Sequence, residues 1–70
     1  MTPLMLRNLW SIVEATQSHF LLNLDDPSLV RWLVKQLYHQ RFMNHAEENA
    51  LVDYIQSKLP LIRELAEQRV

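Results

Sequence analysis

The chain has 70 residues, contains no glycine and no cysteine, and carries a formal net charge of −1 at pH 7. This length allows a single small domain, 1–70, and the missing glycines exclude dinucleotide fingerprints, P-loops and nucleophile elbows, which need glycine for close backbone approach or positive φ. The missing cysteines exclude disulfides and thiol chemistry, and the near-neutral charge provides no global attraction to nucleic acid or anionic lipid.

The amino-terminal segment MTPLMLRNLW is apolar at first but lacks a cationic region, and Arg7 and Asn8 interrupt it before a signal-peptide core can form. The sequence also contains no apolar run of 18 residues. We therefore expect a cytoplasmic protein that neither spans nor binds a membrane.

A first helix of about five turns is predicted from Pro3 to about Leu24. Thr2 can cap its free N–H groups, and Pro3 suits the first helical position, where a missing donor costs nothing. One half of the helical wheel is mostly apolar: Met5, Leu6, Leu9, Trp10, Ile12, Val13, Thr16, Phe20 and Leu24. Leu4 and Leu22 fall on the polar half, where they can extend a contact surface.

A second helix should follow, because Pro27 disfavours the α conformation at Asp26 and so makes Asp26 the expected N-cap. Apolar residues between Leu29 and Met43 cover about two-thirds of the helix circumference, whereas a helix packed on one side needs about a third to a half. This helix therefore needs two covering neighbours, or one neighbour and a partner molecule. Fraying is expected around Gln40 to Met43.

A third helix is predicted after Asn44, which forms a capping-box pattern with Glu47. Its apolar stripe consists of Leu51, Val52, Ile55, Leu59, Ile62 and Ala66. Pro60 interrupts this stripe without changing its phase, which leaves two alternatives, a kinked continuation or a closely following short fourth helix. The sequence thus predicts an all-α fold, a three-helix bundle whose last helix is kinked or split at Pro60.

Excess apolar surface on the second helix favours a protein-binding role. The side chains that we expect at such a contact are Trp10, Leu22, Trp32, Tyr38 and Phe42, with Trp32 foremost. The alternative is that the first and third helices bury the second helix completely. We expect a small helical protein that acts through protein–protein contact, by self-association as a homodimer or by docking to a protein partner.

A basic strip on the second helix provides the alternative function, a nucleic-acid-associated regulatory role. The strip consists of Arg31, Lys35, His39 and Arg41. The third helix is a poor recognition helix, because Glu47, Glu48 and Asp53 would repel phosphate. A solvated helix face is the simpler interpretation of the strip, so we favour a protein partner over a nucleic-acid partner.

Metal and catalytic sites find little support in the sequence. His39, His45 and Glu48 have suitable side chains for zinc, but their spacing matches no compact metal motif. The serines and histidines lie in no motif that would place an activated hydroxyl beside an oriented imidazole. We expect no metal, no cofactor, no small-molecule substrate and no enzymatic activity.

Two segments carry a resemblance to other proteins, LWSIVE at 9–14 and YIQSKLPLIRELA at 54–66. They resemble segments of short, uncharacterised all-helical proteins from cyanobacterial genomes, and the resemblance covers about half of the chain. It implies a bacterial, cytoplasmic protein, and it brings no function and no site residues with it.

Overall fold

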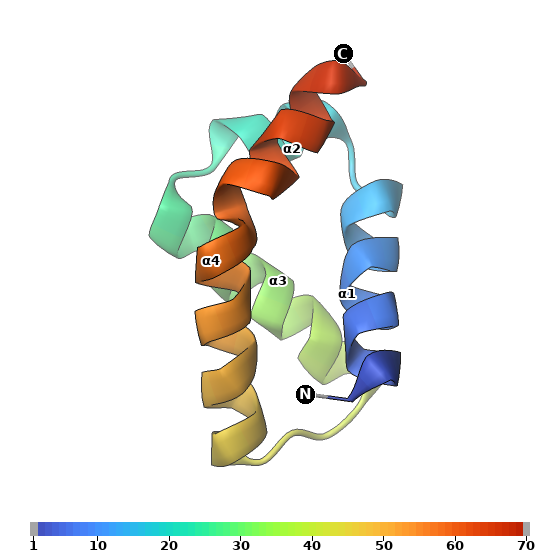
Figure 1. Cartoon of the computed structure of the whole chain (residues 1–70), viewed down its shortest axis with the longest axis vertical. Coiled ribbons are helices and arrows are strands. Elements are labelled where there is room, and N and C mark those ends of the chain that lie inside the picture. Colours follow the sequence, from blue (N-terminus) through green and yellow to red (C-terminus); the bar gives the residue numbers. More distant parts are fainter. Residues whose placement is uncertain (1, 70) are drawn as a thin grey trace.

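A computed structural model describes residues 2–69, and within this range the chain forms four helices. They are α1 (Pro3–Ala15), α2 (Ser18–Asn23), α3 (Asp26–Gln40) and α4 (His45–Gln68). Figure 1 shows α1 and α4 along opposite sides of the molecule, α3 crossing diagonally between them, and α2 across the end that α4 reaches last. The predicted all-α fold is confirmed, and its additional helix comes from a break in the first predicted helix.

The single helix predicted from Pro3 to Leu24 is wrong, because the chain leaves the helical conformation at Thr16 and Gln17. The Thr16 hydroxyl donates to the carbonyl oxygen of Ile12 over 2.7 Å, which supports the end of α1. The extended backbone then turns α2 toward α4, against which it packs.

This turn changes which side chains of α2 are buried. Leu21 is fully buried, and Leu22, which was predicted on the polar side, packs half-buried against the core. Phe20, which was predicted on the apolar side, remains 36% exposed. The predicted assignment failed here because the wheel of one continuous helix does not apply beyond Thr16.

The break between α1 and α2 is held by an arginine from the end of α4. Arg69 donates from Nη1 to the carbonyl oxygen of Glu14 over 2.8 Å and from Nη2 to those of Val13 and Thr16 over 3.4 and 3.3 Å. Carbonyl groups at the end of a helix lack partners within the helix, so these bonds satisfy groups that the break exposes.

The N-cap of α3 is Asp25, and the prediction of Asp26 is wrong by one residue. The Asp25 carboxylate accepts the backbone N–H of Ser28 over 2.9 Å. Asp26 and Pro27 then occupy the first turn, where no backbone N–H is needed for the helix. Asp26 instead pairs with Arg63 of α4, whose Nη2 lies 2.7 Å from the Asp26 carboxylate.

The predicted capping box at the start of α4 is confirmed. The Asn44 side chain accepts the backbone N–H of Glu47 over 2.8 Å, and the Glu47 carboxylate accepts the N–H of Asn44 over 3.2 Å. Pro60 lies inside α4, which continues through it to Gln68, so the helix is not split there. Since proline has no N–H, the carbonyl oxygen of Gln56 receives no helical bond from position 60.

The core draws side chains from all four helices and from the α3–α4 connection. Its members are Met5, Leu9, Val13, Leu21, Leu29, Val30, Leu33, Val34, Leu37, Met43, Leu51, Ile55, Leu59, Ile62 and Ala66. On α3, this burial leaves Tyr38 40% exposed and Trp32 half-buried. The wide apolar arc of α3 is thus covered on two sides and partly open between them. None of the helices within residues 2–69 is both long and apolar enough to cross a bilayer.

Candidate functional site

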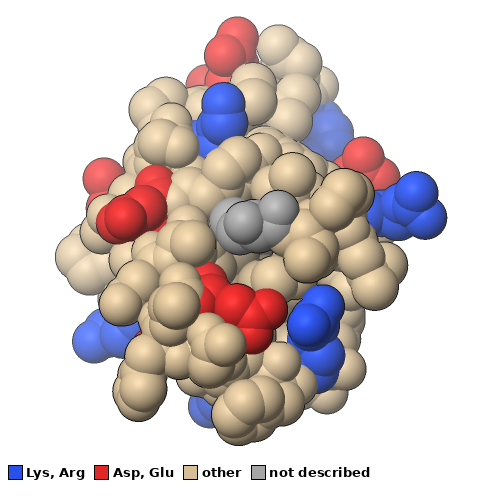
Figure 2. All heavy atoms as spheres, turned by 60° about the horizontal axis from the view of Figure 1, so that its bottom comes forward, with Lys and Arg blue, Asp and Glu red and all other residues tan. Residues whose placement is uncertain are grey.

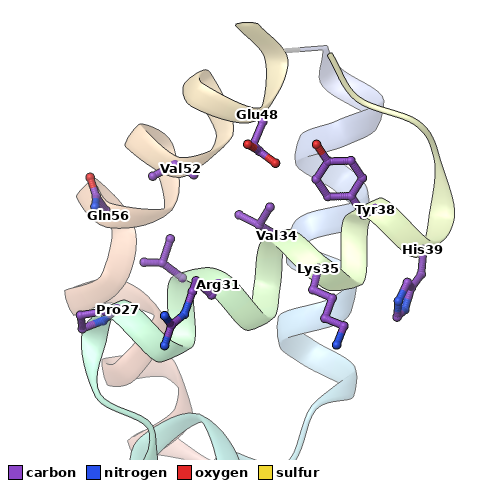
Figure 3. A pocket seen from close by; sticks show the side chains of 10 residues that line it. Pro27, Arg31, Val34, Lys35, Tyr38, His39, Glu48, Val52 and Gln56 are labelled. Carbon is purple, nitrogen blue, oxygen red and sulfur yellow. The ribbon is translucent and has the colours of Figure 1, made fainter. Parts of the chain in front are cut away.

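A groove lies between α3 and α4, with a volume of about 630 Å³. Its apolar lining, here called the floor, consists of Val30, Val34 and Val52. Figure 3 shows Tyr38 at one end of the groove. The groove exists because α3 crosses α4 diagonally, so the two helices diverge away from their contact (Figure 1). Val30 and Val34 of this floor are almost fully buried, whereas Val52 on α4 is half-buried.

Helical spacing places the side chains of the groove. Val30, Val34 and Tyr38 follow one another at intervals of four on α3 and therefore share a face of that helix. Glu48 and Val52 have the same spacing on α4 and form the opposite wall with Gln56. Two valines on α3 and one on α4 thus line the groove, together with longer side chains from both helices.

One end of the groove is closed by a tyrosine and a carboxylate. Figure 3 shows the hydroxyl of Tyr38 and the carboxylate of Glu48 pointing toward one another from the two helices. Hydrogen bonding to the Glu48 carboxylate, together with partial desolvation, raises the pKa of Tyr38 above its ordinary value of 10.0.

A row of basic side chains follows the α3 edge of the groove. Arg31, Lys35 and His39 lie there at intervals of four, all exposed (Figure 3). The ion pairs formed within residues 2–69 involve other basic residues, so neither Arg31 nor Lys35 is paired with a carboxylate in that range. Arg41, which was predicted as part of the strip, pairs instead with Glu47 across 3.7 Å.

The two tryptophans that were predicted at a contact surface lie away from the groove. Trp32 packs against Phe20 of α2, with ring centroids 4.8 Å apart and planes tilted by 59°. Trp10 of α1 donates from its indole Nε1 to the Tyr54 hydroxyl of α4 over 3.1 Å. Both rings are half-buried and join helices within the molecule.

The remaining predicted contact residues are also dispersed. Tyr38 lines the groove, Leu22 packs half-buried against the core, and Phe42 in the α3–α4 connection is 81% exposed. Figure 2 shows the end of the molecule where this connection lies, with scattered positive and negative side chains around uncharged surface. The five predicted contact residues therefore do not form one surface, and Tyr38 alone among them lines the groove.

The sequence analysis did not identify the residues that form the floor and the acidic wall of the groove. Val30, Val34 and Val52 were assigned to the apolar stripes of their helices, which is consistent with their low exposure but does not place them in a groove. The spacing of Glu48, Val52 and Gln56 was the available signal. It could not reveal the groove, because a groove depends on the angle between two helices.

The histidines of the α3–α4 region do not combine with carboxylates into a metal site. Within the described part of the chain, no three His, Asp or Glu side chains come close enough together to hold a metal ion. Figure 3 shows the His39 ring turned away from Glu48 and from the Tyr38 hydroxyl. The groove thus combines an apolar floor, a basic edge and one carboxylate.

Comparison of the chain with protein-family models, with curated proteins and with solved structures finds no match. The groove and the exposed side chains around it are therefore the features from which a function can be inferred.

Proposed function

We propose that this protein acts by binding another protein, either a second copy of itself or a different partner, through the groove between α3 and α4. The observation that carries this proposal is the groove itself, which has a volume of about 630 Å³ and is lined by Val30, Val34, Val52 and the exposed ring of Tyr38. Apolar surface of this kind gains free energy when a partner removes it from water.

The shape and chemistry of the groove suit a helix as its occupant. Helical partners commonly place apolar side chains, spaced by three and four residues, into a groove between two helices. Arg31 and Lys35 at the edge can pair with carboxylates that flank such a stripe, and the Tyr38 hydroxyl oxygen can accept a hydrogen bond. These polar groups would set the register of the partner, while the valines would provide the apolar contact.

The proposal assigns the groove a binding role and no catalytic one. Its imidazole, His39, points away from its carboxylate, Glu48, so the two are not placed to act on one substrate atom (Figure 3). We further propose a cytoplasmic location, because a chain without cysteine needs no oxidising compartment for its fold.

Photo-crosslinking in the native host tests this proposal whatever the partner is. Tyr38 is replaced by benzoylphenylalanine, which retains an aromatic ring at the groove and bonds covalently to neighbouring chains on illumination. The matched control carries the same amino acid at Ser11, an exposed position on α1. Mass spectrometry of the adducts identifies the bound protein.

The expected result is a protein adduct from position 38 that is absent from position 11. This adduct should disappear when Val52, on the groove floor, is changed to glutamate in a variant whose helical circular dichroism is retained. Absence of any adduct at position 38, or an adduct that Val52→Glu leaves unchanged, would overturn the proposal.

Nucleic-acid binding along the basic row is the second candidate, and it is favoured by the exposure of Arg31 and Lys35, which form no ion pair with the carboxylates of residues 2–69. Glu48 on the facing wall and the pairing of Arg41 with Glu47 weaken it, since both reduce the positive potential along the row. Fluorescence anisotropy with labelled single-stranded and duplex oligonucleotides separates the two functions. Affinity that falls steeply with salt, and that Arg31→Ala reduces, would favour nucleic acid.

A further inference from the structure

The two walls of the groove differ in charge. Arg31 and Lys35 make the α3 edge basic, whereas the charged residue that lines the α4 wall is Glu48. Both bases lack a carboxylate partner within residues 2–69. A groove with one basic and one acidic wall is complementary to a copy of itself that is turned so that opposite walls meet.

We infer that the occupant of the groove is a second copy of this chain, related by a two-fold axis that runs along the groove. This inference rests on the proposed binding role of the groove and specifies its partner. Rotation about this axis places α3 of one copy over α4 of the other. Each residue keeps its position along the length of the groove. Lys35 of each copy then faces Glu48 of the other, twice in one dimer.

The charges also exclude the other face-to-face arrangement. A two-fold axis across the groove would place α3 over α3, so that Arg31 and Lys35 of both copies would oppose each other. Like charges in an interface cost free energy, so this orientation is disfavoured. The arrangement with α3 over α4 pairs opposite charges at both edges of the groove.

The size of the protein gives a second reason for a symmetric partner. A chain of 70 residues without cysteine has a small core, and oligomerisation is a common means by which such small folds gain stability. A two-fold contact is closed, because each copy uses the same surface, and it therefore yields a dimer rather than a filament.

Charge reversal in the purified protein tests this geometry. The variants are Lys35→Glu and Glu48→Lys, with Arg7→Glu, an exposed position on α1, as a control of equal charge change to Lys35→Glu. Light scattering after size exclusion, over a wide concentration range, reports the mass relative to the 8.4 kDa chain. Circular dichroism and urea unfolding establish that each variant is folded.

We expect a wild-type monomer–dimer equilibrium that Arg7→Glu leaves unchanged. Lys35→Glu and Glu48→Lys should each weaken dimerisation by about tenfold or more, since the two-fold axis repeats every repulsive contact. An equimolar mixture of the two variants should restore dimerisation. In the mixed dimer, one edge pairs the two substituted side chains, which carry opposite charges. The other edge pairs the native Lys35 with the native Glu48. Native mass spectrometry identifies the restored species as a one-to-one heterodimer.

Three outcomes would overturn the inference: a monomer at all concentrations, a dimer that neither charge reversal weakens, or a mixture that fails to restore association. A monomer whose position 38 crosslinks to a different protein in the host would overturn self-association alone and leave the binding role of the groove intact. A dimer without any groove-dependent crosslink at position 38 would instead contradict the binding role.

Discussion

The guanidinium group of Arg63, late in α4, donates a hydrogen bond over 2.8 Å to the carbonyl oxygen of Leu24, which lies 39 residues earlier. The same group donates to the carbonyl oxygen of Leu21 over 2.9 Å and contacts the Asp26 carboxylate at 2.7 Å. One side chain thus satisfies carbonyl groups at the end of α2 and pairs with the first turn of α3. The chain contains no glycine, and at this helix end a side chain from α4 satisfies the carbonyl groups while Leu24 is extended.

Removal of the Arg63 side chain should therefore destabilise the whole fold. Arg63→Ala leaves two partly buried carbonyl groups and one carboxylate without their donor, and we expect a loss of about 1–3 kcal/mol in the free energy of unfolding. Urea denaturation followed by circular dichroism measures this change. Arg7→Ala, on the exposed face of α1, is the control. Equal effects of the two substitutions would show that the Arg63 contacts contribute nothing.

The arginine contacts also explain which parts of the fold the sequence could predict. The caps by Thr2 and Asn44 involve residues three positions apart, so a local pattern is enough to find them. The break at Thr16 depends in part on Arg69, whose bond to Glu14 spans 55 residues. No local pattern contains that information, and the apolar phase of 3–24 favoured one continuous helix.

The candidate site shows the same division between local and distant information. The intervals of four that align Arg31, Lys35 and His39 on α3 are local, and the exposed row was predicted from them. To predict the apolar floor, one must know the point at which α4 diverges from α3. Helix crossing is determined by packing of side chains that are distant in sequence, so Val52 could be assigned to an apolar stripe but not to a groove.

Asp25 should make the stability of the fold depend on pH. Hydrogen bonds from the Ser28 hydroxyl and backbone N–H hold the pKa of Asp25 below its ordinary value of 3.8. The ionised carboxylate therefore stabilises the folded state above pH 3.8, and this contribution is lost as the pH falls through the lower, folded-state pKa. Asparagine is an equally good N-cap without the charge, so Asp25→Asn isolates the electrostatic part.

Urea unfolding from pH 7 down to about pH 2.5 measures this effect. We expect the wild type to exceed Asp25→Asn in stability at neutral pH and the difference to shrink toward zero in acid. Ser28→Ala removes the hydroxyl but keeps the backbone N–H, and it should reduce the pH-dependent difference. A difference that stays constant over the whole range would contradict the assigned role of the charge.

The tilted aromatic pair of Phe20 and Trp32 should couple α2 to α3. Their ring centroids lie 4.8 Å apart in a tilted arrangement, a geometry worth about 0.5–1.5 kcal/mol beyond simple burial. A double-mutant cycle with Phe20→Ala and Trp32→Ala measures this coupling from urea denaturation. We expect the double variant to be less destabilised than the sum of the single variants. Strict additivity would mean that each ring stabilises the fold independently.

Pro60 should cost the protein stability within α4, where it is exposed and removes the helical bond to Gln56. Pro60→Ala restores this bond and a helix-favouring residue, and we expect a gain of about 1–3 kcal/mol in the free energy of unfolding. Ser57→Ala, one turn earlier on an exposed face, controls for alanine propensity alone. The neighbours Leu59 and Ile62 are buried in the core. A loss of stability in Pro60→Ala would therefore show that the proline bends α4 as these two side chains require, and that their packing outweighs the missing hydrogen bond.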